Sequence, residues 1–115
     1  TFGHVVGDIV LQAVAKDIVK CTRDSDVVFR YGGEEFVVIL TNTQSDGADF
    51  LAERIRQSVE TLDVDALANN TRITVSAGVT QFRSGDTAVD LITRADEQLY
   101  RAKELGRNRV QSSAE

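Results

Sequence analysis

Residues 27–40 read VVFRYGGEEFVVIL, two runs of β-branched and aromatic residues separated by Gly32-Gly33 and two glutamates. Runs of this kind favour strands, and glycine accepts the positive φ angles of a tight turn. The stretch therefore predicts a β-hairpin with Gly32, Gly33, Glu34 and Glu35 at its turn.

Helical periodicity appears on both sides of this hairpin. Residues 5–22 place Val10, Val14, Ile18 and Cys21 on one face, the spacing of an amphipathic helix. After the hairpin, a second helix is predicted with Ser45 or Asp46 capping its start. Its apolar stripe consists of Ala48, Leu51, Ala52, Ile55, Val59 and Leu62.

The last third of the chain predicts a strand, a helix and a short final strand. Residues 72–82 alternate apolar and polar, the pattern of a strand with one buried face. A helix is expected from Asp86-Thr87 to Gly106, which is well placed to stop it, and Val110 is assigned to a short last strand. Helices must cover a sheet that contains an antiparallel hairpin, so the prediction is an α+β sandwich rather than a Rossmann fold.

Composition limits the classes of function. The 115 residues suffice for one domain, and no apolar stretch could span a membrane. The net charge of −5 argues against nucleic acid as a partner. A single cysteine, Cys21, cannot form an internal disulfide, which favours a reducing compartment and predicts a cytoplasmic domain.

The glycines and glutamates of the hairpin turn are the strongest chemical signal. Glycines let a ligand approach the backbone closely, and paired carboxylates suit Mg²⁺ or Mn²⁺ together with substrate phosphates. From these residues alone, a solvated acidic hairpin tip is the favoured interpretation. In the same way, Asp8 could be an ordinary early-helix charge, and Lys103 and Arg107 ordinary cations at a helix end.

The motifs together resemble the GGDEF domain family, the catalytic module of diguanylate cyclases. Residues 32–36 resemble its signature in the GGEEF form, and further matches run in order along the chain from Gly3 to Asn108. These are Gly3-His4, Gly7-Asp8, Ser76-Ala77-Gly78-Val79, Ala95-Asp96 to Tyr100, Lys103 and Gly106-Arg107-Asn108.

The resemblance implies a nucleotidyl-cyclase-like (palm or ferredoxin-like) fold, with a mainly antiparallel central sheet covered by helices. It implies that two GTP are condensed to cyclic di-GMP and two pyrophosphates by a homodimer, with Mg²⁺ or Mn²⁺. Glu34 and Glu35 would be catalytic and would bind the metal. The GTP-binding residues would be Asp8 for the guanine edge, Gly32 and Gly33 for close backbone approach, and Lys103 and Arg107 for the triphosphate, these last two on one side of the final helix turn.

Arg23-x-x-Asp26, five residues before Gly32, resembles the family's inhibitory site for its own product, and Arg54 matches an additional arginine of that site. Arginine forks suit phosphates and stack on guanine. The alternative from the residues alone is a charged loop between helix and strand.

The family's first strand, which carries a metal-binding aspartate, has no counterpart here. Residues 1–115 are therefore expected to be a partial GGDEF domain, inactive in isolation. Two other functions stay open: a GGDEF domain without activity that serves as a receptor for cyclic di-GMP or GTP, and a purely structural dimerisation domain. Intact Glu34 and Glu35 argue against the receptor.

Overall fold

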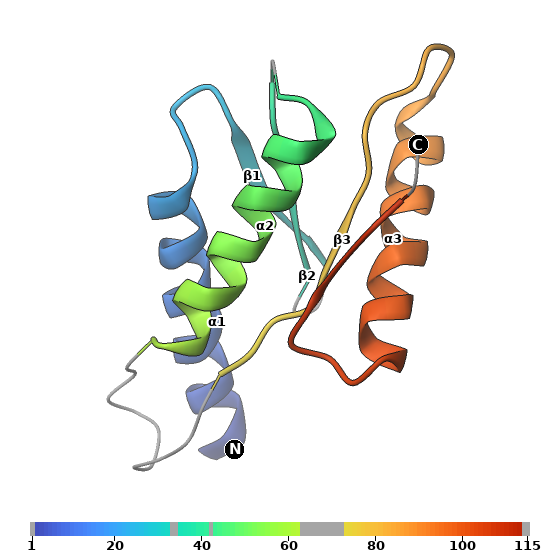
Figure 1. The fold of residues 1–115 in the computed structure, drawn as a ribbon. Coiled ribbons are helices and arrows are strands. Elements are labelled where there is room, and N and C mark those ends of the chain that lie inside the picture. The colour runs from blue at the N-terminus through green and yellow to red at the C-terminus, as the bar shows by residue number, and fades with distance from the viewer. Residues whose placement is uncertain (1, 33–34, 42, 63–72, 114–115) are drawn as a thin grey trace.

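The computed structural model describes residues 2–32, 35–41, 43–62 and 73–113. Its elements follow one another as a helix, a hairpin, a helix, a strand, a helix and a short strand, the predicted order. They are α1 (Phe2–Cys21), β1 (Val27–Gly32), β2 (Glu35–Ile39), α2 (Ser45–Glu60), β3 (Ala77–Val79), α3 (Ala88–Glu104) and β4 (Val110–Ser112). Figure 1 shows α1 and α2 on one side of the strands and α3 on the other.

The hairpin and the first two helices share an apolar core. Val14 and Ile18 of α1 meet Val59 of α2, and all three side chains are buried. Around them pack Val10, Val28, Phe36, Val38, Ile55, Ile73 and Val75. One face of the hairpin is thus covered by α1 and α2, as expected for helices that cover a sheet with their apolar faces.

The strands that the structure describes pair in two separate sheets. β1 and β2 are antiparallel, with Val28 opposite Val38 and Gly32 opposite Glu35. β3 and β4 are parallel, with Gly78 opposite Gln111. A single, mainly antiparallel sheet was predicted. Among the described residues, antiparallel pairing occurs only in the hairpin, and the other two strands form a sheet of their own. The parallel pairing follows from α3, because a helix between two strands carries the chain back to the end where the first strand began.

The strand predicted over residues 72–82 is shorter than expected, since only Ala77–Val79 form β3. On either side of β3, the chain forms hydrogen bonds that involve side chains in place of strand pairing. Before it, the Ser76 hydroxyl accepts the backbone N–H of Asn108 at 3.2 Å. After it, the Arg94 guanidinium donates to the Thr80 hydroxyl at 2.7 Å and to the Gln81 carbonyl at 2.7 Å.

The two later helices begin in different ways. α3 has Thr87 as its N-cap, and Thr87 and Asp90 form a reciprocal capping box, which confirms its predicted start. α2 is preceded by Gln44 in the N-cap position, with no side-chain cap hydrogen bond. The prediction of Ser45 or Asp46 as cap was wrong, because the chain turns helical one residue earlier and both residues fall inside the helix.

β3 packs directly on α3 through Gly78. A Cβ built on Gly78 would lie 2.2 Å from the carbonyl oxygen of Ala95 and 2.3 Å from the backbone nitrogen of Leu99. No side chain fits in that space, so glycine is required here by the close approach of the strand and helix backbones.

Candidate functional site

The hairpin turn is the centre of the predicted active site. Glu35 is the first residue of β2 and is half-buried, and Gly32, its partner across the hairpin, has open space where a Cβ would stand. Gly33 and Glu34 lie outside the described residues. Within the described part of the chain, no three His, Cys, Asp or Glu side chains converge into a metal site. Of the predicted metal ligands, the structure describes Glu35, an oxygen donor of the kind that Mg²⁺ and Mn²⁺ prefer; such ions usually bind through one or two carboxylates together with substrate phosphates.

Asp8, the predicted guanine ligand, lies on α1 with an exposed side chain. An exposed carboxylate can accept two N–H groups from a guanine edge. Asp8 thus remains accessible for the predicted contact.

The two predicted triphosphate ligands occupy different local structures. Lys103 is in the last turn of α3, whereas Arg107 lies beyond its end at Glu104. The prediction that both cations share one helix turn was wrong. Gly106 has a φ of 123°, and the backbone N–H groups of Gly106 and Arg107 donate to carbonyls of the last turn. This Schellman-type ending stops the helix before Arg107.

The residues after Gly106 continue in the left-handed region. Arg107 has a φ of 64° and Asn108 a φ of 47°. A left-handed conformation is uncommon for a residue other than glycine, although asparagine adopts it more readily than most. The turn that carries Arg107 is therefore strained, and neighbouring contacts must hold it in place.

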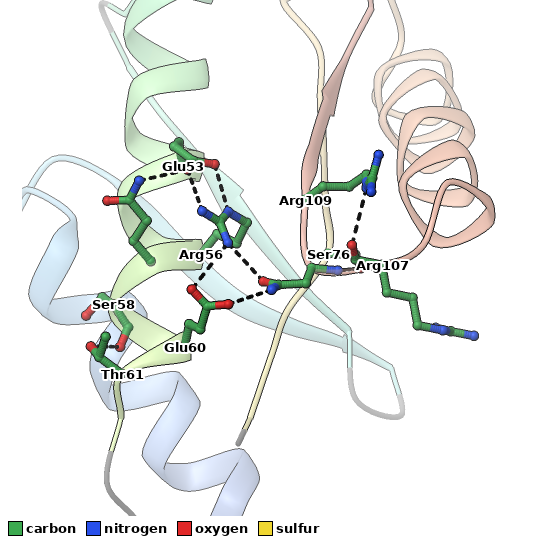
Figure 2. Close-up of polar contacts among 10 residues, drawn as sticks. Glu53, Arg56, Ser58, Glu60, Thr61, Ser76, Arg107 and Arg109 are labelled. Atoms are coloured by element: carbon green, nitrogen blue, oxygen red, sulfur yellow. Dashed lines mark hydrogen bonds and ion pairs between the residues drawn. The ribbon is translucent and has the colours of Figure 1, made fainter. Parts of the chain in front are cut away.

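Four side chains, which we call the clamp, hold this turn against α2: Glu53, Arg56, Glu60 and Asn108. Figure 2 labels the three that belong to α2. Arg56 donates to Glu53 at 2.8 and 2.6 Å and to the amide oxygen of Asn108 at 3.0 Å. The amide nitrogen of Asn108 donates to Glu60 at 2.6 Å. Hydrogen bonding to Arg56 lowers the pKa of Glu53 to about 2, and the same bond raises the pKa of Arg56.

In the predicted product site, Arg23 and Asp26 form a hydrogen-bonded turn. The Asp26 carboxylate accepts the backbone N–H of Arg23 at 2.8 Å, and only 2% of its side chain is exposed. The Arg23 guanidinium donates to the Thr41 carbonyl at 3.0 Å and to the Thr43 hydroxyl at 2.7 Å. Arg23 is thereby anchored to the segment that leads into α2, while 62% of its side chain remains exposed.

The second oxygen of Asp26, Oδ1, is buried without a hydrogen-bond partner and lies 3.7 Å from the Arg23 guanidinium. An unsatisfied buried acceptor is costly. Arg54, the third predicted member of this site, is exposed on α2. The structure thus places Arg23 and Asp26 together and puts Arg54 on the helix that follows Thr43.

Comparisons with known proteins identify the family of this chain. Residues 1–109 match the family model described as "Diguanylate cyclase, GGDEF domain". The chain belongs to the GGDEF family. Its relatives include Diguanylate cyclase A of Treponema denticola, 47% identical over 96% of this chain and 30% of the relative. Diguanylate cyclase DgcM of Escherichia coli is 47% identical over 95% of this chain and 26% of its own length.

Solved GGDEF structures share the fold. The active GGEEF domain of a diguanylate cyclase from Vibrio cholerae is 37% identical, with a TM-score of 0.85, over 95% of this chain and 69% of that one. The GGDEF domain of DgcB from Caulobacter crescentus, solved in complex with c-di-GMP, is 34% identical, with a TM-score of 0.88, over 96% and 66%. This GGDEF domain thus spans less than a third of the two curated relatives and about two thirds of the two solved chains.

Sequence reasoning overlooked the clamp and the structural use of Asp26. The spacing of Glu53, Arg56 and Glu60 at three and four residues is a helical ion-pair signal that the sequence does contain. Nothing in the local sequence connects those residues to Asn108, 52 residues after Arg56.

Among the described residues no helix is long and apolar enough to cross a membrane.

Proposed function

We propose that this GGDEF domain catalyses the condensation of two GTP into cyclic di-GMP and two pyrophosphates. The observation that carries the proposal is the Gly-Gly-Glu-Glu stretch at the turn of the β1–β2 hairpin, where Glu35 begins β2. The identity of 47% to proteins named diguanylate cyclases supports it.

Each chemical step is a displacement at an α-phosphorus. The 3′-oxygen of one GTP forms a bond to the α-phosphorus of the other, the bond to the β-phosphate breaks, and pyrophosphate leaves. The proton of the 3′-hydroxyl passes to a base, for which Glu34 is the candidate. Two such steps close the ring, so two domains, each holding one GTP, must face each other as a homodimer.

The proposed roles of the other residues follow from their chemistry. Gly32 and Gly33 let the nucleotide lie against the backbone, Asp8 accepts from the guanine edge, and Lys103 and Arg107 bind the triphosphate. Mg²⁺ or Mn²⁺ bound through Glu34 and Glu35 would supply charge neutralisation at the reacting phosphates. The cytoplasmic location expected from the single cysteine stays a prediction.

The test is cyclic di-GMP formation by the full-length protein and its variants. Glu34→Ala is expected to lower turnover by at least ~10²-fold, the usual effect of removing a general base. Glu34→Asp is the matched control, because it restores the GGDEF spelling of the signature and retains a carboxylate; it should stay active. Turnover of Glu34→Ala within a few-fold of wild type would contradict the assignment.

The same assay separates the enzyme from its main alternative, a receptor module. A wild-type protein that forms no cyclic di-GMP at any GTP concentration, yet binds cyclic di-GMP saturably, would favour the receptor. The GGDEF domain of DgcB from Caulobacter crescentus was solved in complex with c-di-GMP, which supports the choice of this ligand for the test.

We further propose feedback inhibition at Arg23, Asp26 and Arg54. Oδ1 of Asp26 has no hydrogen-bond partner, which supports this, since it could accept from a guanine N–H if the side chains covering it move aside. Charge-assisted contacts contribute about 1.5–3 kcal/mol each, so Arg23→Ala or Arg54→Ala should weaken product binding roughly 10- to 100-fold.

Calorimetric titration of cyclic di-GMP measures this effect, with Lys20→Ala as a control for loss of a nearby exposed cation. Inhibition should be non-competitive with GTP, because the product site is separate from the hairpin turn. Equal binding by wild type and Arg23→Ala would mean that Arg23-x-x-Asp26 is only a structural turn.

A further inference from the structure

Asn108 has bonding requirements that few side chains could meet. Its amide oxygen accepts from Arg56 at 3.0 Å while its amide nitrogen donates to Glu60 at 2.6 Å. Its backbone N–H donates to the Ser76 hydroxyl at 3.2 Å. An amide carries a donor and an acceptor on one rigid group, which matches a cation and an anion that stand one helical turn apart.

The clamp fastens a strained segment to a well-anchored helix. Arg56, with 15% of its side chain exposed, is itself held by Glu53 and by a 3.7 Å ion pair with Glu60. α2 in turn is tied to the apolar core through Val59, which is fully buried. The position of the left-handed turn is therefore set from outside the turn.

Arg107 is the residue that this arrangement orients. It precedes Asn108, has its own left-handed φ of 64°, and its side chain extends away from the clamp in Figure 2. The backbone on its N-terminal side is fixed by the Schellman-type hydrogen bonds at the end of α3. With Asn108 fixed on the other side, the direction of the Arg107 Cα–Cβ bond is determined before any ligand arrives.

We infer that Asn108 is a positioning residue for nucleotide binding: its amide, held between Arg56 and Glu60, sets the turn that presents Arg107 to the triphosphate. This inference rests on the proposed role of Arg107 as a triphosphate ligand. Preorganising a binding group in this way improves affinity, because less conformational freedom is lost when the ligand binds. The clamp contributes no group to the ligand itself and acts only through Arg107.

Asn108→Asp is the informative variant. It preserves shape and the acceptor for Arg56 but places a second carboxylate against Glu60, where the amide nitrogen now stands at 2.6 Å. Two carboxylates at this distance repel each other, so the turn should lose its fixed position. Adding Glu60→Gln restores one donor and one acceptor with the roles exchanged, and the net charge of the clamp is that of wild type.

The experiment measures binding of a non-hydrolysable GTP analogue to the full-length protein by calorimetry, well below the unfolding temperature of every variant. Arg107→Ala should weaken binding roughly 10- to 100-fold, the effect of one lost charge-assisted contact. Asn108→Asp should weaken it about tenfold, and Asn108→Asp with Glu60→Gln should recover most of that loss. In an Arg107→Ala background, Asn108→Asp should have no further effect on affinity.

Each contrary outcome has its own meaning. If Arg107→Ala leaves affinity unchanged, Arg107 is not a triphosphate ligand, and both the proposed site and this inference fail. If Arg107→Ala weakens binding but the effects of Arg107→Ala and Asn108→Asp simply add, Asn108 does not act through Arg107, and this inference alone is wrong. Failure of Glu60→Gln to rescue Asn108→Asp would also overturn it, because the exchanged hydrogen bonds would then not matter.

Discussion

The two sheets of this GGDEF domain are held against their helices by different physical means. The antiparallel hairpin packs on α1 and α2 through branched apolar side chains centred on Val14, Ile18 and Val59. The parallel pair β3–β4 packs on α3 through bare backbone at Gly78. Polar contacts, from Arg94 at one end and the clamp at the other, complete that second region.

The two kinds of packing should differ in how much stability a single substitution costs. An apolar cluster spreads its stability over many small contacts, so one truncation leaves a cavity and a partial loss. A backbone-to-backbone contact tolerates no added atom, and an ion pair depends on the charge of both partners. We therefore expect the packing under the hairpin, with its proposed catalytic turn, to tolerate single substitutions with a partial loss of stability. The contacts that hold the turn carrying Arg107 should tolerate them less well.

The largest expected effect is that of Gly78→Ala. The new Cβ would fall 2.2 Å from the Ala95 carbonyl oxygen, so strand and helix must separate. We expect a loss of about 3 kcal/mol or more in the free energy of unfolding, at the upper end of overpacking effects. Denaturant titration measures it.

Gly7→Ala is the matched control, because Gly7 lies inside α1 and a Cβ there meets nothing within 4 Å. The same chemical change should stabilise the domain by about 0.5–1 kcal/mol through helix propensity. Equal effects of the two substitutions would contradict the close approach at Gly78.

Val59→Ala tests the apolar support of the hairpin. Removing two methyl groups from a side chain with no exposed surface should cost about 2 kcal/mol, the sum of lost burial and a residual cavity. Val89→Ala, at a position on α3 that is 72% exposed, should change stability by less than about 0.5 kcal/mol. A Val59→Ala protein as stable as the Val89→Ala protein would show that the cluster is not the core of this region.

The smallest effect is a pH dependence of the polar support at Asp86. Hydrogen bonding from Arg94, and then from the Arg83 backbone, lowers the pKa of Asp86 from 3.8 to about 2. A carboxyl with a lowered pKa in the folded state stabilises the protein above its unfolded pKa, and that contribution is lost as pH falls through the folded pKa. The Asp86–Arg94 contribution should therefore disappear between about pH 4 and pH 2.

Asp86→Asn measures this contribution. The variant should be less stable than wild type at about pH 6. The difference should shrink at about pH 2.5, because there the carboxyl is already largely protonated in the unfolded state and begins to be protonated in the folded state. Asp96→Asn, an exposed position on α3, is the control and should show little difference at either pH. A stability gap for Asp86→Asn that is the same at both values would contradict the ion-pair interpretation.

Much of the fold could be read from local patterns. The hairpin, the three helices, the capping box at Thr87 and the stop at Gly106 all depend on residues close together in the chain. The paired carboxylates and their glycines were equally visible, since Gly32, Gly33, Glu34 and Glu35 are contiguous. Their family assignment is confirmed by the match over residues 1–109, while their individual roles stay predictions.

Tertiary structure decided whatever depends on partners distant in the sequence. The length of β3, the parallel pairing with β4, and the close contact of Gly78 with α3 arise only when α3 carries the chain back beside β3. Asp26 became a buried turn residue, and Asn108 the link between α2 and the Arg107 turn. Periodicity reports which face of an element is apolar, but a hydrogen bond depends on the position of single atoms, and those positions are set when the elements pack.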